Sequence, residues 1–265
     1  MKHILKRIGI KSQPDLMPIF LSAFGKSPEL RQISQKHSTD FTGLRDVGYL
    51  AYSAEDQPVA FYGVFPIEVR VDGKFVMVAQ SGDTMVIEEH RKYGLFTLLA
   101  NETYKLCIAN NIAGVFGFPS PSSYPGFVKR LGWGHIENIK KFQFLIPTVP
   151  LAEISMRLSV FTNAILKWNC FLARLMFPEG VPFEGSILDE KLDGIRRTDG
   201  YWKYKLNSDN VKLIRLKGCD VVIKFGESLG IGDINYDTLK DLRRVMSMLK
   251  VLCFFCGINR IVFYT

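Results

Sequence analysis

The residues with the clearest chemical potential lie in one short stretch, Glu-Glu-His-Arg-Lys-Tyr-Gly-Leu-Phe at positions 88–96. Arg91 and Lys92 precede Gly94, after which apolar residues recur at helical spacing. A helix start exposes backbone N–H groups that lack intrahelical partners, together with the positive end of the helix dipole. Glycine lets such a turn approach a ligand closely. The stretch therefore predicts a turn that holds a phosphate group.

Two familiar phosphate-binding loops do not fit this stretch. A nucleoside-triphosphate P-loop needs GxxxxGK[ST], and a dinucleotide fold needs GxGxxG, whereas only one glycine occurs here. Taken alone, the stretch is explained equally well as a charged turn that ends in glycine and leads into a core helix.

The charge balance bears on the class of partner. The 265 residues carry a net charge of +8, and Lys plus Arg exceed Asp plus Glu by 17 to 13 both in residues 1–150 and in residues 151–265. A nucleic-acid-binding protein more often concentrates its charge on one element. The even spread fits a small anionic ligand or an acidic surface at least as well, and we expect no nucleic-acid partner.

Cysteine content and hydropathy bear on the compartment. The five cysteines form an odd set in a chain of this size, which indicates reduced thiols and a cytoplasmic protein. The lone CxxC pair, Cys253 and Cys256, lies in an apolar run, so we expect core packing rather than a metal or redox site.

Residues 151–176 predict a long apolar helix with three cationic side chains. It packs between two halves of the protein or lies on a membrane surface, and we expect no stable membrane insertion.

The remaining pattern predicts alternating strands and helices. In the first half we expect a helix over 14–25, strands over 48–53, 59–71 and 75–86, a helix from 94 to 110, a strand over 113–118, a short helix over 126–132 and a strand over 133–146. In the second half we expect strands over 201–206, 211–218, 220–226 and 260–264 and a helix over 238–255.

The two halves share an order of elements. Residues 106–118 and 252–264 both pass from a helix end to a strand, with Leu, Cys and Ile in register. We interpret the second half as a partial copy of the first. The expected organisation is a first domain over 1–150, a connecting helix and linker over 151–182, and a partial second copy over 183–265.

The stretch from Thr84 to Trp133 resembles the GNAT superfamily of acyl-CoA N-acyltransferases. Val86, Arg91 and Gly94 match the strand and turn of that family, and the Leu-Gly-Trp sequence at 131–133 matches its later Leu-Gly-aromatic motif. The resemblance covers roughly residues 10–150. It implies an α+β fold with a mixed, mostly antiparallel sheet flanked by helices, here followed by a smaller related α/β unit.

The resemblance also implies the coenzyme contacts. Backbone N–H groups of the turn would hold the pyrophosphate of acetyl-CoA, the acyl donor, and the pantetheine arm would pair with the preceding strand where two strands splay apart. The implied binding residues are Met85, Val86, Ile87, Arg91, Lys92, Tyr93, Gly94, Leu95 and Phe96.

This sequence departs from the family at several positions. Phe96 replaces a small residue of the loop, and Glu88 replaces a proline. Val128 occupies the position of a tyrosine that protonates the leaving thiolate in many members, and a valine cannot donate a proton. We predict that Tyr124, one helical turn earlier, replaces it, because a phenol with a pKa near 10 can protonate a thiolate. Otherwise Tyr124 packs the loop onto the sheet.

A base must also take a proton from the acceptor ammonium. Asp83 is our first candidate, because it lies on the strand where the thioester is expected, although it could be a solvated carboxylate. The other candidates are Glu68, Glu88 and His90, and we expect His135 to be a surface or core histidine. The aromatic cluster of Tyr201, Trp202 and Tyr204 either lines the acceptor pocket or forms the core of the second half.

These features predict an N-acetyltransferase that moves an acyl group from acetyl-CoA to a primary amine of a small molecule by direct attack in a ternary complex. An amino sugar is one candidate acceptor. The alternatives are a coenzyme-binding or interaction module that has lost its chemistry, and an aminoacyl transferase whose donor is transfer RNA. Whether the protein forms a homodimer stays open.

Overall fold

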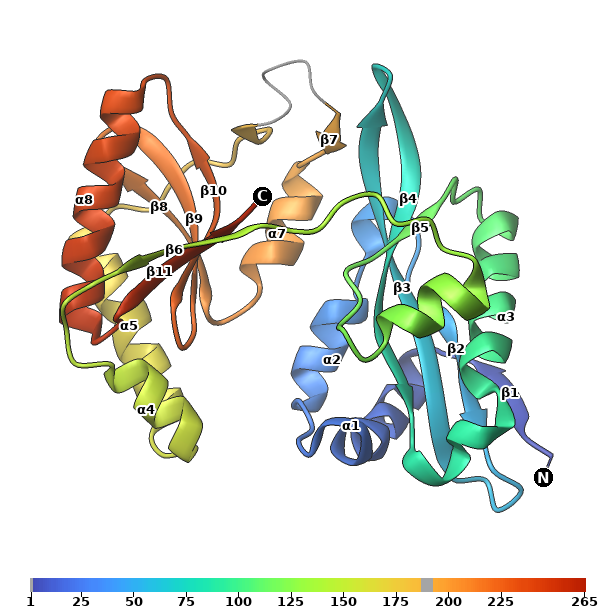
Figure 1. Cartoon of the computed structure of the whole chain (residues 1–265). Coiled ribbons are helices and arrows are strands. Elements are labelled where there is room, and N and C mark those ends of the chain that lie inside the picture. The colour runs from blue at the N-terminus through green and yellow to red at the C-terminus, as the bar shows by residue number, and fades with distance from the viewer. Residues whose placement is uncertain (1, 187–192) are drawn as a thin grey trace. The chain divides into compact units, whose positions relative to one another are not determined.

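The computed structural model describes residues 2–186 and 193–265, which form two compact units. Unit 1 comprises residues up to 136 together with 193–196, and unit 2 comprises 137–186 and 197–265. Each unit contains one sheet with helices packed against it (Figure 1). The expected α+β class with mostly antiparallel sheets is confirmed. The division at residues 136 and 137 differs from the boundary at 150 that we expected.

The sheet of unit 1 has the order β1-β2-β3-β4-β5, with β7 paired to the far end of β3. Only β4 and β5 run parallel; every other pair is antiparallel. The strands are β1 (Ile4–Arg7), β2 (Val47–Tyr52), β3 (Pro58–Val71), β4 (Lys74–Val86), β5 (Val115–Phe116) and β7 (Gly194–Ile195).

Helices cover both faces of this sheet, because its central strands are apolar on both sides. The helices are α1 (Leu16–Phe24), α2 (Leu30–His37) and α3 (Leu95–Ala109), and a π-helical turn follows at Gly126–Arg130. On one face Leu95 and Leu99 of α3 pack against Tyr62 of β3. On the other, Leu16 of α1 packs against Phe61. Successive residues of β3 thus face opposite cores.

Unit 2 contains a five-stranded sheet with the order β6-β11-β10-β9-β8. Val245, Leu249 and Leu252 of its longest helix are fully buried against it. The strands are β6 (Lys141–Leu145), β8 (Val211–Leu216), β9 (Cys219–Phe225), β10 (Leu229–Asn235) and β11 (Arg260–Tyr264), and the helices are α4 (Leu151–Leu158), α5 (Thr162–Met176), α7 (Asp199–Leu206) and α8 (Leu239–Cys256). Cys253 and Cys256 are buried in this core, and burial raises the pKa of the Cys256 thiol to about 12.

The two sheets share a topology. The series β8, β9, β10, α8 and β11 repeats the order of β2, β3, β4, α3 and β5. In both series the first three strands are antiparallel neighbours, and the strand after the helix returns parallel to the strand before it. Neighbour order and direction therefore both support a duplicated unit.

Three elements differ from the sequence-based expectations. The strand expected over 133–146 is limited to β6, and it pairs with β11 rather than closing the first sheet. The helix expected over 151–176 is broken, because Ser159 and Phe161 adopt left-handed backbone angles, with φ of 53° and 56°. Residues 201–206 form α7 rather than a strand, since the Thr198 hydroxyl accepts a hydrogen bond from the Tyr201 N–H and starts a helix.

Other parts were absent from the expectations or were assigned differently. We expected none of β1, α2 and β10. In unit 2, Tyr201 and Trp202 are buried, and the Trp202 indole donates to the Phe183 carbonyl at 3.1 Å. The position of these two rings favours the core interpretation of the aromatic cluster.

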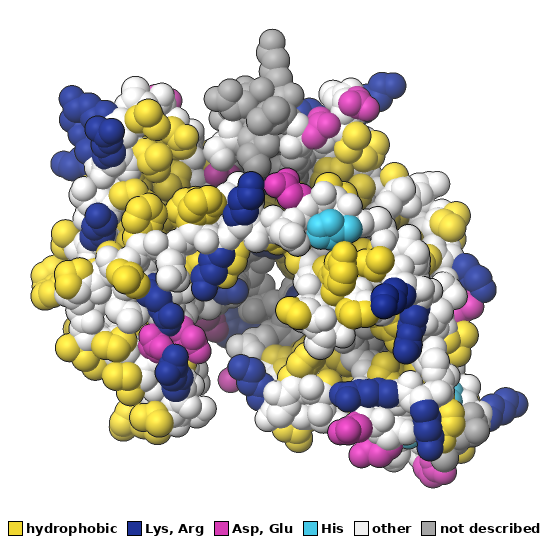
Figure 2. Space-filling model, in the orientation of Figure 1, with side chains coloured by type: hydrophobic (Ala, Val, Ile, Leu, Met, Phe, Trp, Pro, Cys, Tyr) yellow, Lys and Arg dark blue, Asp and Glu magenta, His cyan; other side chains and the backbone are white. Residues whose placement is uncertain are grey.

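The outer surfaces of the unit 2 helices carry apolar and basic side chains together (Figure 2). On α5, Trp168, Phe171 and Leu175 are exposed, whereas Ala173 is buried against the sheet. Among the described residues, no helix combines the length and the apolar character needed to cross a bilayer. Attachment of this face to a membrane surface stays a prediction.

Candidate functional site

The strands β4 and β5 separate soon after they meet. Their pairing consists of Ala79 with Val115 and Gln80 with Phe116, and β4 then continues from Ser81 to Val86 along β3. Parallel strands that diverge in this way leave backbone groups of the longer strand facing the gap. The gap lies where the sequence analysis placed the pantetheine arm.

A β-bulge changes the direction of the side chains of β4 beside this gap. Gly63 pairs with Gly82 and Phe61 with Met85, so that Asp83 and Thr84 together oppose one residue of β3. Asp83 takes a left-handed backbone angle, with φ of 56°. Bulges and such angles concentrate at functional sites, because they redirect side chains. Here the bulge gives Asp83 a different direction from that of a regular strand residue.

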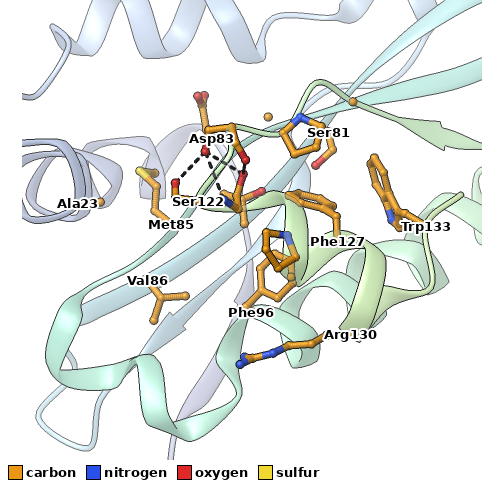
Figure 3. Close-up of a pocket in the computed structure, with 18 of the residues that line it drawn as sticks. Ala23, Ser81, Asp83, Met85, Val86, Phe96, Ser122, Phe127, Arg130 and Trp133 are labelled. Atoms are coloured by element: carbon orange, nitrogen blue, oxygen red, sulfur yellow. Dashed lines mark hydrogen bonds between the residues drawn. The ribbon is translucent and has the colours of Figure 1, made fainter. Parts of the chain in front are cut away.

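A cavity of about 810 Å³ opens at the gap (Figure 3). Its lining comes from the end of α1, from β4, from the start of α3, and from the loop and π-helical turn that follow β5. The lining residues on β4 are Ser81, Gly82, Asp83, Thr84, Met85 and Val86. One strand thus contributes a continuous stretch of backbone to the cavity.

Three aromatic rings form the opposite wall. Phe96 of α3 packs edge-on against Phe127 with their ring centroids 5.3 Å apart, and Phe127 packs against Trp133 at 4.6 Å. Figure 3 shows these rings side by side, with Arg130 extending toward the side of Phe96. Edge-to-face packing of this kind fixes ring positions. The wall is therefore rigid and apolar.

A chain of hydrogen bonds supports the wall from behind. The Trp133 indole donates to the Tyr104 hydroxyl at 2.8 Å, which lies 2.8 Å from the Tyr62 hydroxyl. Ser81 donates to the same Tyr62 hydroxyl at 3.1 Å. Burial raises the pKa of both phenols, so both are neutral at physiological pH. The network positions Trp133 and Ser81 without introducing charge.

The turn before α3 has the geometry that its sequence predicts. Gly94 has a φ of 69° and joins a 3₁₀ turn, Glu88–Tyr93, to the first residue of α3. A Cβ atom added at Gly94 would meet no atom within 4 Å, and no side chain caps the helix start in the described residues. Arg91 fixes the turn by donating from Nε to the Val86 carbonyl at 3.4 Å. Open space thus adjoins an uncapped helix start.

Positively charged side chains contribute to the lining of this cavity. Arg91, Lys129 and Arg130 all belong to its lining, whereas Asp83 is the carboxylate among those residues. Lys129 and Arg130 come from the π-helical turn, more than thirty residues beyond Arg91. Cationic side chains and helix N–H groups together are the preferred surroundings of a phosphate.

Four of the nine predicted coenzyme residues line the cavity: Met85, Val86, Arg91 and Phe96. Ile87, Lys92, Tyr93, Gly94 and Leu95 do not. The Ile87 N–H donates to the Val59 carbonyl of β3 at 3.0 Å, and the Lys92 ammonium lies over the Tyr93 ring. Leu95 is buried in the core. Contact of the backbone N–H groups of this turn with a phosphate therefore stays a prediction.

The predicted catalytic residues are separated. Asp83 lines the cavity and forms an ion pair with Lys36 at 2.5 Å. Tyr124 lies outside the lining, and its ring packs edge-on against His135 with centroids 5.7 Å apart. Val128 is also outside the lining. The role predicted for Tyr124 therefore needs a rotation of its side chain and stays a prediction.

The other candidate bases do not reach this cavity. Glu68 pairs with Arg196 at 3.0 Å near the opposite end of β3. His90 hydrogen-bonds His3 at 2.8 Å, and Glu88 is exposed on the turn. None of these three acids and bases belongs to the lining. Asp83 is the candidate that the structure brings to the cavity.

Several hydroxyl groups of the cavity lining were not predicted from the sequence. Within the described residues, the Thr84 Oγ1 atom is buried and has no hydrogen-bond partner. Ser120, Ser122 and Ser123 line the cavity from the loop after β5, where they hydrogen-bond one another. The run of serines shortly after β5 was the available signal in the sequence.

Residues 6–136 match the family model of the acetyltransferase (GNAT) domain. No curated protein matches the chain.

Solved structures with the same fold cover both units. A GCN5-related N-acetyltransferase from Kribbella flavida matches with a TM-score of 0.59 and 12% identity over 100% of this chain and 65% of its own. A probable N-acyltransferase from Enterococcus faecalis V583 gives 0.58 and 12% over the same shares. A putative acetyltransferase from Pyrococcus horikoshii gives 0.58 and 14% over 98% of this chain and 79% of its own. This chain thus spans 65% of the length of the first two, and at these identities the likeness concerns the fold.

The matched residues 6–136 coincide with unit 1, which holds the splayed strands, the glycine turn and the cavity. The family model, the fold of the solved structures and the geometry of the site agree. Unit 1 is therefore a domain of the acetyltransferase (GNAT) family.

Proposed function

We propose that unit 1 transfers an acetyl group from acetyl-CoA to a primary amine of a small molecule, within a ternary complex. One observation carries this proposal: β4 and β5 separate into a cavity that is lined by a continuous stretch of β4, by the start of α3 and by three cationic residues. An extended thioester arm with an anionic end has matching chemistry. An amino sugar is one candidate acceptor.

The coenzyme fits this cavity in a defined direction. Its diphosphate would lie at the start of α3, held by backbone N–H groups and by Arg91, Lys129 and Arg130. Its pantetheine arm would run along Ser81–Val86 as an added strand, because amide groups of the arm can pair with free strand backbone. The thioester would then reach the bulge at Asp83 and Thr84.

The chemistry needs a neutral amine, a polarised carbonyl and a proton for the leaving group. Asp83 accepts the proton that the ammonium must lose, and the amine nitrogen then forms a C–N bond to the thioester carbon. A backbone N–H of β4 polarises the carbonyl oxygen. The C–S bond breaks, and the thiolate takes a proton from a hydroxyl group, for which Tyr124 remains our predicted donor. The nitrogen loses its second proton as the amide forms, and that proton restores the hydroxyl group. Proximity within the cavity supplies a large share of the rate.

The test is to titrate the purified full chain with coenzyme A by calorimetry, and then to follow acetyl-CoA cleavage with a panel of primary amines. We expect saturable binding at one site and turnover with at least one amine. Failure to bind coenzyme A would overturn the proposal. Tyr124→Phe should lower kcat while leaving coenzyme affinity unchanged, and an unchanged kcat would exclude Tyr124 as the proton donor.

An inactive coenzyme-binding module is the second candidate. Val128 lies at the position of the usual acid, and Tyr124 lies outside the cavity lining. Coenzyme binding without turnover on every amine of the panel would favour this candidate.

A further inference from the structure

A second cavity, of about 480 Å³, adjoins the first within unit 1. The two cavities share Asp83 and Phe24. The second is lined by Phe20, Phe24, Lys26, Ser27, Pro28, Gln32, Ile33, Lys36 and Asp83, which come from α1, α2, the loop between them and the bulge of β4. A molecule in this cavity would therefore meet the thioester of the proposed function at Asp83.

The walls of the second cavity are mainly apolar. Phe20 and Phe24 lie one turn apart on α1 with ring centroids 5.9 Å apart, and Pro28 and Ile33 add aliphatic surface. Flat and apolar groups gain most from contact with such a surface. The cavity is thus suited to a molecule with an apolar or flat body.

The charges of the second cavity are unequal. Lys26 and Lys36 provide two ammonium groups against the one carboxylate of Asp83. The Lys36 Nζ lies 2.5 Å from the Asp83 carboxylate and 4.9 Å from the centroid of the Phe65 ring. An ammonium group has three N–H donors, so it can hold Asp83 and an anionic group of a ligand together. A purely cationic acceptor would meet two like charges here.

We propose that this cavity binds an amine that also carries an anionic group, a carboxylate or a phosphate, on an apolar or flat body. The amine lies at Asp83, the anionic group lies at Lys26 and Lys36, and the body contacts Phe20 and Phe24. This inference rests on the proposed function and names the class of its acceptor. Amines without an anionic group, and polyamines, bind less tightly.

The first experiment uses two pairs of probes that differ in the anionic group: phenylalanine with phenylalaninol, and glucosamine 6-phosphate with glucosamine. Dissociation constants are measured by calorimetry on the full chain, without coenzyme. We expect the anionic member of at least one pair to bind at least about tenfold more tightly. The pair that shows the preference identifies the anion as carboxylate or phosphate. Equal binding within both pairs, or no binding of any probe, overturns the inference.

The second experiment assigns the preference to the two lysines. Lys26→Met and Lys36→Met should each reduce the preference about tenfold, and Lys36→Arg should restore it. Lys105→Met is the matched control, because Lys105 is exposed on α3 and pairs with Glu102. If the anionic probe still binds more tightly than its neutral partner in both lysine variants, the inference is contradicted.

The outcomes separate this inference from the proposed function. Coenzyme affinity is measured on the same variants and should be unchanged, and circular dichroism confirms that each is folded. If the wild-type protein does not bind coenzyme A, only the acyltransferase proposal is refuted, because the probe affinities are measured without coenzyme. Coenzyme binding with equal use of charged and neutral amines would refute the acceptor class alone.

Discussion

The passage from β4 to α3 in unit 1 and the passage from β10 to α8 in unit 2 begin alike. Each strand pairs with a parallel neighbour over only two residues, as far as Gln80 in β4 and Gly230 in β10, and then continues alone on that side. Each also contains a register shift against its antiparallel partner. The two passages differ in how the following helix starts.

The first helix starts without a side-chain cap, and the second is capped by its own residues. At α3 the position before the helix is Gly94, which has no side chain. At α8 it is Thr238, whose hydroxyl donates to the Asp241 carboxylate at 2.5 Å and accepts from the Asp241 N–H at 3.3 Å. A capping hydroxyl and a carboxylate in the first turn already satisfy the helix start. An external anion therefore has less to bind at α8.

The surrounding charges reinforce this difference. Arg91, Lys129 and Arg130 line the cavity in unit 1. In unit 2 the corresponding strand carries Asp233, which binds Arg197 and accepts a hydrogen bond from the Ser186 hydroxyl at 2.5 Å. The same topology thus leaves cations in a cavity of one unit and forms internal hydrogen bonds in the other. We therefore propose a single coenzyme site, in unit 1.

The strongest test of this comparison is Gly94→Val. We expect coenzyme affinity to fall at least about 100-fold, because a β-branched residue is strained at positive φ and its side chain enters the space where the diphosphate lies. Calorimetry measures the change. Gly73→Val is the matched control: Gly73 has a φ of 76°, with nothing within 4 Å, in the turn between β3 and β4. Equal weakening in both variants would contradict the assignment.

A smaller effect is expected from Arg130→Gln. Loss of one charge-assisted hydrogen bond should weaken coenzyme binding about tenfold, and the difference from wild type should shrink as salt is added. Dissociation constants at low and high salt check this. Arg244→Gln, which removes a cation from the start of α8, should leave them unchanged. A comparable loss in both variants would mean that general charge, rather than the site in unit 1, governs affinity.

Removal of the cap in unit 2 should affect stability rather than binding. Thr238→Ala is expected to lower the free energy of unfolding by about 0.5–2 kcal/mol, because the start of α8 loses its capping hydroxyl. Urea denaturation followed by circular dichroism measures the loss. Coenzyme affinity should be unaltered. Any weakening of coenzyme binding would show that unit 2 contributes to the site.

A further expected effect concerns alkaline pH and is shared by the two units. Burial raises the pKa of the Cys107 thiol in unit 1 to about 11 and that of Cys256 in unit 2 to about 12. The unfolded thiols ionise near pH 9, so the folded state retains protons that the unfolded state loses, and stability decreases as the pH rises from 9 to 11. Urea midpoints at pH 8, 9 and 10 should decline in that order, and less steeply in Cys107→Ala. A constant midpoint would contradict this.

The turn at Gly94 could be predicted from the sequence because its chemistry is local. A glycine after two cations and before an apolar helical pattern carries the information in a few residues. Asp83 was predicted from its position on the strand, but its bulge depends on the register between β3 and β4, which no single strand reveals. Lys129 and Arg130 were missed as site residues, because only the fold brings them to a cavity that begins at Ser81.

Unit 2 shows where local reasoning fails. Tyr201, Trp202 and Tyr204 favour a strand by intrinsic preference, whereas the cap at Thr198 and burial of the rings select a helix. The partner of β6 could not be predicted, because pairing between distant strands leaves little trace in either sequence. The strand expected over 133–146 in the first half is therefore reduced to β6, in the sheet of unit 2.

The pairing of β6 with β11 constrains how unit 2 is made. Phe142 of β6 stacks on Phe263 of β11 with ring centroids 5.1 Å apart, although more than a hundred residues separate them. During synthesis, β6 leaves the ribosome long before β11 is made. Its apolar side chains therefore remain exposed until β11 pairs with it. Completion of this sheet is a late event that a chaperone can protect, and nascent chains that stop before residue 260 should be the aggregation-prone species.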